Sequence, residues 1–300
     1  IENSKIFIIS RVEPKFKNVQ FKPIHLSGLA EAVELAKRII ENSYSTLNIT
    51  DENISQICEY VANHPLAIEL SLNLCNKRSF EKIIGQLLKY KTEAIEKLSE
   101  RLFKDILDDE STKEVERKFI YEFSIFNEKV NEEVIEAILG EEVFYEAIPS
   151  LIDKNLLSFE NSLYDTHPLI KEFCYDKLEN KGQLHQKAAD YFISKREEKL
   201  DVTIEKQIFY HLKGFTNIPE IENSLNKYGR ILVRQAYYDF VISLVEYLTT
   251  KNINHPFHDL LLGNINKIKG NWNKALSFYE TVEKNNTDKE LALESLLEIG

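Results

Sequence analysis

The sequence contains no methionine, one tryptophan, three cysteines and no long hydrophobic run. None of its apolar stretches approaches the roughly 18 residues that a membrane-spanning helix requires, and no basic-then-apolar leader opens it. Cys58, Cys75 and Cys174 fall within helical patterns without metal-ligand spacing, so we expect reduced thiols in the core and no metal site. These absences predict a cytoplasmic protein without a membrane span.

Motifs for phosphoryl transfer are also missing. There is no Gly-x-x-x-x-Gly-Lys-Ser/Thr loop and no apolar strand that ends in paired acids. No Ser/His/Asp or Cys/His set stands in a catalytic context, and carboxylate pairs such as Glu132-Glu133 lie in acidic helical stretches where a solvated face is expected. Because the chain starts at Ile1 and stops at Gly300 within a helical pattern, we expect a piece of a longer protein that is not catalytic alone.

The charge is acidic and unevenly distributed. The net charge is −11, and residues 111–180 hold seven Lys and Arg against sixteen Asp and Glu. Nucleic-acid binding depends on cationic side chains that displace counterions, so nucleic acid is an unlikely partner for this segment. A hydrophobic content of 43% is enough for two or three domains with cores of their own.

The first apolar run, residues 5–9, is typical of a buried parallel strand, and Ser10-Arg11 follow at its carboxyl end. Ligands of open α/β sheets bind at that end. Arg11 is therefore either a phosphate ligand or an ordinary surface arginine.

Four helices are predicted next, and we expect them to form a bundle. Ser27 is the expected cap of the first, and Thr50-Asp51 start the second. The second helix ends before Asn63-His64 because a residue that precedes proline avoids the helical region. Pro65 starts the third helix and Phe80 the fourth.

Residues 112–180 predict three helices and a hairpin. Apolar spacing indicates helices near 115–126, 134–139 and 143–152, and a turn joins the short strands 156–159 and 163–165. This is the winged-helix pattern, which binds DNA through its third helix. Here that helix is acidic and would repel phosphate, so a DNA-binding transcription regulator with helical repeats remains only the alternative.

From residue 184 onward the pattern is wholly helical. Leu262-Gly263, Gly270, Ala275 and Tyr279 fit the skeleton of a tetratricopeptide repeat, and Ile299-Gly300 restart it after slightly more than the usual spacing of about 34 residues. Stacked helix pairs of this kind form a surface that grips a protein or peptide. A helical scaffold without any nucleotide role is a further alternative.

Two helices are predicted to begin with a His-Pro pair, His64-Pro65 and His167-Pro168. Proline suits the first helical position because the missing N–H would be unpaired there. The remaining N–H groups of such a helix start can receive a phosphate. Taken singly, each proline simply starts a helix, and His167 acts as a helix cap.

In this order, behind the strand at 5–9, the two motifs resemble the second half of the nucleotide switch of STAND-class P-loop ATPases of the NB-ARC-like kind. The resemblance implies that Arg11 senses the terminal phosphate. It also implies that Pro65 and Leu66, matching the second half of a Gly-Leu-Pro-Leu motif, place a proline against adenine. Asn63 and His64 depart from that motif.

The resemblance further implies a role for His167, which matches the histidine of a Met-His-Asp motif that contacts the β-phosphate of ADP. Thr166 and Pro168 depart from the other two positions of the motif. Pro168 replaces its aspartate, and the loss of that carboxylate weakens the contact expected to hold the winged helix on the nucleotide domain. The Mg²⁺ that accompanies ATP would be held by residues outside this segment. The whole protein would be a slow ATPase that forms a homo-oligomer when activated.

Together, these observations predict a mainly α chain. We expect the end of a nucleotide-binding α/β domain at 1–22, a helical bundle at 23–106, a winged helix at 107–182 and tetratricopeptide-like repeats at 183–300. The expected function is the regulatory portion of an ADP/ATP-dependent signalling switch that senses a partner through its repeats.

Overall fold

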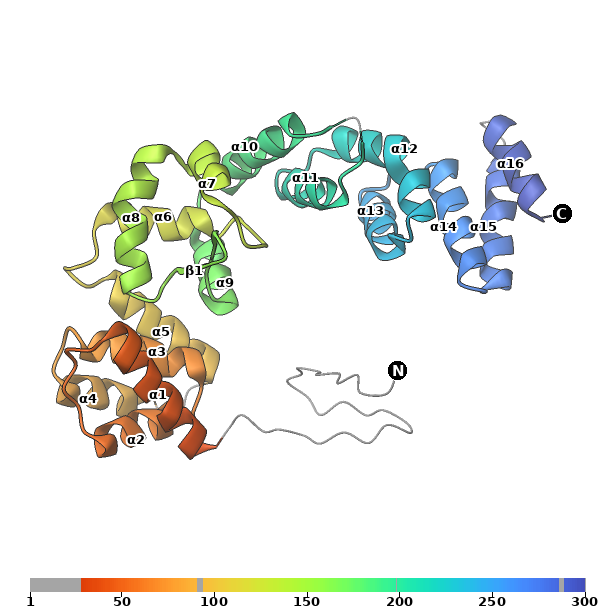
Figure 1. Cartoon of the computed structure of the whole chain (residues 1–300). Coiled ribbons are helices and arrows are strands. Elements are labelled where there is room, and N and C mark those ends of the chain that lie inside the picture. The colour runs from red at the N-terminus through yellow and green to blue at the C-terminus, as the bar shows by residue number, and fades with distance from the viewer. Residues whose placement is uncertain (1–27, 91–93, 198, 286–288, 300) are drawn as a thin grey trace. The chain divides into compact units, whose positions relative to one another are not determined.

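The structure is a computed structural model that describes residues 28–90, 94–197, 199–285 and 289–299 (Figure 1). Within these residues it is mainly α, with 16 helices and one two-stranded sheet, which confirms the predicted fold class. The predicted strand at 5–9, Arg11, the cap Ser27 and the segment 1–22 lie outside the described residues.

The chain forms two compact units. The first comprises residues up to 117 with 148–158 and 166–170, and the second comprises 118–147, 159–165 and the residues from 171 onward. The four-part division expected from the sequence stays a prediction.

The first unit is built around a buried helix. Its helices are α1 (Leu29–Ser43), α2 (Asp51–Tyr60), α3 (Pro65–Cys75), α4 (Phe80–Tyr90) and α5 (Ile95–Leu107). Every residue of α3 from Leu66 to Cys75 except Glu69 is buried, and the other four helices contact it. A helix that is apolar all round belongs in a core. The sequence analysis did not identify α5, which is a fifth helix in this stretch.

Local signals explain the helix boundaries here. Gly28 is the N-cap of α1, whereas α2 begins as predicted after Thr50, whose side chain accepts the N–H of Asn53 at 3.2 Å. The left-handed residues Ala62 and Asn63, with φ of 50° and 57°, follow the end of α2. Pro65 then starts α3, as the sequence predicts.

Three helices and a hairpin follow in the predicted order. They are α6 (Glu114–Phe123), α7 (Glu132–Leu139), α8 (Glu141–Asp153), β1 (Ser158–Glu160) and β2 (Leu163–Asp165), and α9 (Pro168–Lys177) comes directly after them. Asn161 and Ser162 join the strands with φ of 53° and 62°, a pair of left-handed residues that is typical of a tight hairpin turn. A bridge between Val130 and Tyr164 extends this small sheet.

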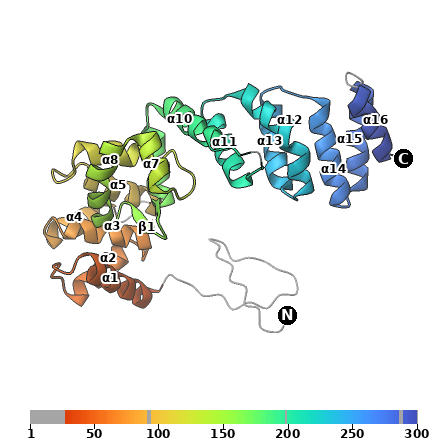
Figure 2. The ribbon, with the colours of Figure 1, turned by 45° about the horizontal axis from the view of Figure 1, so that its top comes forward.

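The second unit contains three helical hairpins, α10/α11, α12/α13 and α14/α15 (Figures 1 and 2). Their helices are α10 (Lys181–Ser194), α11 (Val202–Gly214), α12 (Ile218–Arg234), α13 (Tyr238–Thr250), α14 (Pro256–Ile268) and α15 (Trp272–Asn285), followed by α16 (Lys289–Ile299). At Gly263 an added Cβ would lie 2.4 Å from the ring of Tyr279, which shows that the predicted Leu-Gly and Tyr positions bring α14 and α15 together. The Tyr279 hydroxyl donates to Asn264 Oδ1 at 2.9 Å and holds that ring in place.

All three cysteines are free and buried, as predicted. Burial raises the pKa of Cys75 to about 12 and that of Cys58 to about 11, so both remain protonated thiols at neutral pH. No described helix is long and apolar enough to cross a membrane.

Candidate functional site

The structure places Pro65 and Leu66 differently with respect to solvent. Pro65 is the first residue of α3 and is exposed, whereas the side chain of Leu66 is only 3% exposed and belongs to the core. Pro65 is therefore accessible at this helix start, whereas Leu66 is not.

His167 is exposed and caps the start of α9. Its Nδ1 accepts the backbone N–H of Leu169 at 3.2 Å. The His255-Pro256 pair starts α14 in the same way, because His255 Nδ1 accepts the N–H of Phe257 at 3.1 Å. The helix-cap interpretation of His167 therefore describes its local geometry and needs no ligand.

Thr166 anchors this helix start to the interior. Its side chain is buried, and its hydroxyl donates to the carbonyl oxygen of Leu156 at 2.8 Å. The threonine that departs from the Met-His-Asp motif thus has a structural role, since it ties the residue before His167 to the turn after α8.

The same turn is bound to α3 by a buried polar cluster. Asn73 Nδ2 donates to the carbonyl oxygen of Lys154 at 2.7 Å and to the hydroxyl oxygen of Tyr44 at 3.1 Å. Asn155 Nδ2 donates to the same hydroxyl oxygen at 3.0 Å. Asn73 is 1% exposed, and burial raises the pKa of Tyr44 to about 12. We call Tyr44, Asn73 and Asn155 the asparagine bridge.

A buried ion pair lies beside the asparagine bridge. Lys154 Nζ donates to a carboxylate oxygen of Glu116, and their side chains are 8% and 1% exposed. Two desolvated charges are tolerated in a core only as a hydrogen-bonded pair, so each side chain requires the other. This pair fixes the start of α6 against the turn that carries Asn155.

A continuous set of buried contacts therefore runs from α3 through the asparagine bridge and Leu156 to Thr166, within the first unit. The first unit thus contains both α3 and the residues 166–170 at the start of α9, whereas the rest of α9 belongs to the second unit and Arg11 lies outside the described residues. The sequence pattern did not predict the bridge, although Asn73 is an amide between two leucines of α3.

A second buried polar group, a histidine pair, lies in the second unit. His185 Nδ1 and His211 Nδ1 are 2.9 Å apart, and His185 Nε2 is 3.0 Å from the Tyr175 hydroxyl. Burial lowers the pKa of both histidines, that of His211 to about 3. Among the described residues no three His, Cys, Asp or Glu side chains converge as a metal site.

Comparisons with known proteins identify a likeness of fold. No protein-family model and no curated protein sequence matches the chain. A matching solved structure is the crystal structure of a STAND protein, a signal transduction ATPase with numerous domains, that carries a tetratricopeptide repeat sensor and comes from Pyrococcus horikoshii. The two chains are 17% identical, and the match covers 91% of this chain and 38% of the other with a TM-score of 0.55. This chain therefore has a fold similar to about two-fifths of a STAND protein with a tetratricopeptide repeat sensor.

Proposed function

We propose that this chain is the regulatory segment of an ADP/ATP-dependent signalling switch. The fold likeness to a STAND protein with a tetratricopeptide repeat sensor supports this proposal. The observation that carries it is the set of buried contacts between α3 and Thr166, because it makes the helix starts at Pro65 and His167 parts of one body. Two ligand-facing groups can cooperate only if such a framework holds them.

In this proposal Arg11, Pro65 and His167 clamp ADP, with Leu66 behind the proline. The capping geometry supplies the chemistry that His167 needs. A neutral imidazole whose Nδ1 accepts a hydrogen bond carries its hydrogen on Nε2. That N–H can donate to a phosphate oxygen, and a helix N-terminus favours negative charge nearby. Capping and phosphate binding are therefore compatible functions of one ring.

Exchange of ADP for ATP would release the His167 contact and free the winged helix. Mg²⁺ would be held by residues outside this segment, where the slow ATPase chemistry of the whole cytoplasmic protein would also lie. A partner bound to the helical repeats would bias the equilibrium through different affinities for the two states. The freed state would assemble as a homo-oligomer.

Replacement of His167 by asparagine in the longer protein tests the clamp. Asparagine is a good N-cap, so His167→Asn keeps the capping acceptor and removes the imidazole N–H. A hydrogen bond to a charged group contributes about 1.5–3 kcal/mol, so release of a fluorescent ADP analogue should accelerate about 10- to 100-fold.

His255→Asn is the matched control, since it makes the same change at the other His-Pro start with a capping bond. ADP release from this control should match that of the unmodified protein. Equal release rates for His167→Asn and His255→Asn would refute the clamp.

A further inference from the structure

A groove of about 480 Å³ opens in the second unit between the second helices of two successive hairpins. Its lining includes Lys206, Phe209, Tyr210 and Lys213 from α11, Tyr237 from the turn before α13, and Phe240 from α13. Ligand sites commonly enclose about 300–1,000 Å³ and combine apolar walls with a few polar groups. The volume of this groove falls within that range, and its lining combines aromatic rings with charged side chains.

The α11 wall presents two lysines with aromatic rings between them. Residues 206, 209, 210 and 213 share one helix face because they are three or four positions apart. Lys206 Nζ lies 5.9 Å from the ring centre of Tyr237, and Lys213 Nζ lies 5.5 Å from that of Tyr247. Each ammonium group is attracted to the face of its ring, although only Tyr237 of these two tyrosines lines the groove.

Neither lysine has a carboxylate partner among the described residues. Two nearby carboxylates are paired with other cations. Asp239 at the groove edge lies 3.5 Å from Lys269. Glu205 behind the groove accepts two hydrogen bonds from Arg196, from Nε at 2.8 Å and from Nη2 at 3.0 Å. Glu128 is the remaining carboxylate in the lining. Lys206 and Lys213 therefore make the α11 wall the cationic side of the groove, which is complementary to a negative ligand.

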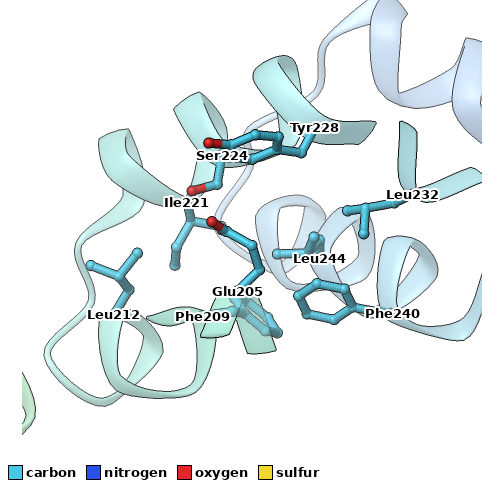
Figure 3. Close-up of a pocket in the computed structure, with 9 residues that line it drawn as sticks. All are labelled: Glu205, Phe209, Leu212, Ile221, Ser224, Tyr228, Leu232, Phe240 and Leu244. Carbon is cyan, nitrogen blue, oxygen red and sulfur yellow. The ribbon is translucent and has the colours of Figure 1, made fainter. Parts of the chain in front are cut away.

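The floor between the lysines is apolar. Phe209 contacts Phe240 edge to face, with ring centres 5.8 Å apart. Behind the two rings lies a small cavity of about 10 Å³, whose lining includes Leu212, Ile221 and Leu244 (Figure 3). The floor can therefore receive an apolar or aromatic side chain.

We propose that this groove binds an acidic peptide segment with a large apolar or aromatic residue between two carboxylates. Lys206 and Lys213 are seven residues apart on a helix, which separates them by roughly 10 Å along its axis. Side chains of an extended chain alternate between its two faces, so residues at positions i, i+2 and i+4 face the groove together. The two carboxylates therefore belong four positions apart, about 13 Å along the chain, and the flexible lysine side chains can reach them. The ring between them lies over Phe209 and Phe240. This inference rests on the proposed function in that it names the partner class that the repeats sense.

The test uses the 300-residue chain and a fluorescein-labelled octapeptide. The peptide has a Gly-Ser background, two glutamates four positions apart and a phenylalanine midway between them. Fluorescence anisotropy should show saturable binding that weakens with added salt. The Lys206→Glu and Lys213→Glu variants should each bind about tenfold more weakly, because each reversal turns an attraction into a repulsion.

Lys227→Glu is the matched control, because Lys227 is also an exposed lysine over a tyrosine, Tyr228, but does not line the groove. It should bind the peptide as tightly as the unmodified chain. Absence of saturable binding, or equal weakening by all three reversals, would overturn the proposal. So would stronger competition by oligothymidylate than by unlabelled peptide, since that result identifies a nucleic-acid site.

The result of the peptide-binding test does not depend on the nucleotide clamp. If the peptide binds as described but leaves ADP release from the longer protein unchanged, the groove stands and the switch proposal fails. If Lys213→Glu binds the peptide normally, the groove proposal fails whatever the His167→Asn result.

Discussion

Asn73 is the residue whose removal best tests the architecture of the first unit. Its side-chain amide joins α3 to the turn at Lys154 and to the hydroxyl of Tyr44, and it is 1% exposed. The replacement Asn73→Ala deletes both hydrogen bonds and leaves the Lys154 carbonyl oxygen in a buried site that water cannot easily reach.

The expected loss of stability follows from these contacts. Each hydrogen bond contributes about 0.5–1.5 kcal/mol net, and a buried polar group left without its partner costs about 1–3 kcal/mol. The lost bond to the Tyr44 hydroxyl and the unpaired Lys154 carbonyl oxygen together cost about 1.5–4.5 kcal/mol. Since about 1.4 kcal/mol corresponds to a tenfold change, amide protons of α3 that exchange through opening of this unit should exchange roughly 10- to 1,600-fold faster.

Hydrogen exchange followed by mass spectrometry is the appropriate assay, because it separates peptides of α3 from those of the second unit. Asn76→Ala is the control: the same chemical change at the exposed residue that ends α3. It should alter exchange by less than about threefold. If Asn73→Ala and Asn76→Ala change α3 protection equally, the asparagine bridge does not hold the unit together.

Two further predictions concern the second unit. Gly263→Ala should destabilise the α14/α15 hairpin by about 1–3 kcal/mol in thermal unfolding, because the new Cβ meets the Tyr279 ring at 2.4 Å. The double variant Gly263→Ala/Tyr279→Leu should recover part of this loss. An unchanged melting temperature for Gly263→Ala would refute the close contact. The histidine pair should make α10 and α11 sensitive to acid. The pKa of His211 is about 3 in the fold, against an ordinary value of 6.5. The stability gained while this ring is neutral is therefore complete above pH 6.5. The free energy of unfolding then falls by up to about 1.4 kcal/mol per pH unit as the pH drops towards 3, because the unfolded chain binds the proton more readily. Hydrogen exchange between pH 7 and 4 should show this loss, and His211→Phe should flatten it; a slope unchanged by the replacement would contradict the assignment.

The sequence alone predicted the mainly helical fold and several helix starts, although it did not indicate α5. Thr50 and Pro65 mark helix beginnings through local chemistry, a side-chain acceptor in one case and a preset φ in the other. The spacing of Gly263 and Tyr279 likewise predicted a close helix pair, because a repeat carries its contact within a single hairpin. Such signals act over a few residues or within one repeat, so they can be read without knowing the rest of the fold.

Tertiary structure alone decided which distant residues meet. Asn73 and Lys154 are 81 positions apart, and nothing in the local pattern of either predicts a bond between a side-chain amide and a backbone carbonyl. The groove between α11 and α13 likewise depends on how two hairpins stack, so Lys206 and Tyr237 could not be assigned to one surface from their spacing. Burial and the satisfaction of buried polar groups are properties of the assembled fold, which is why the bridge and the groove emerge only there.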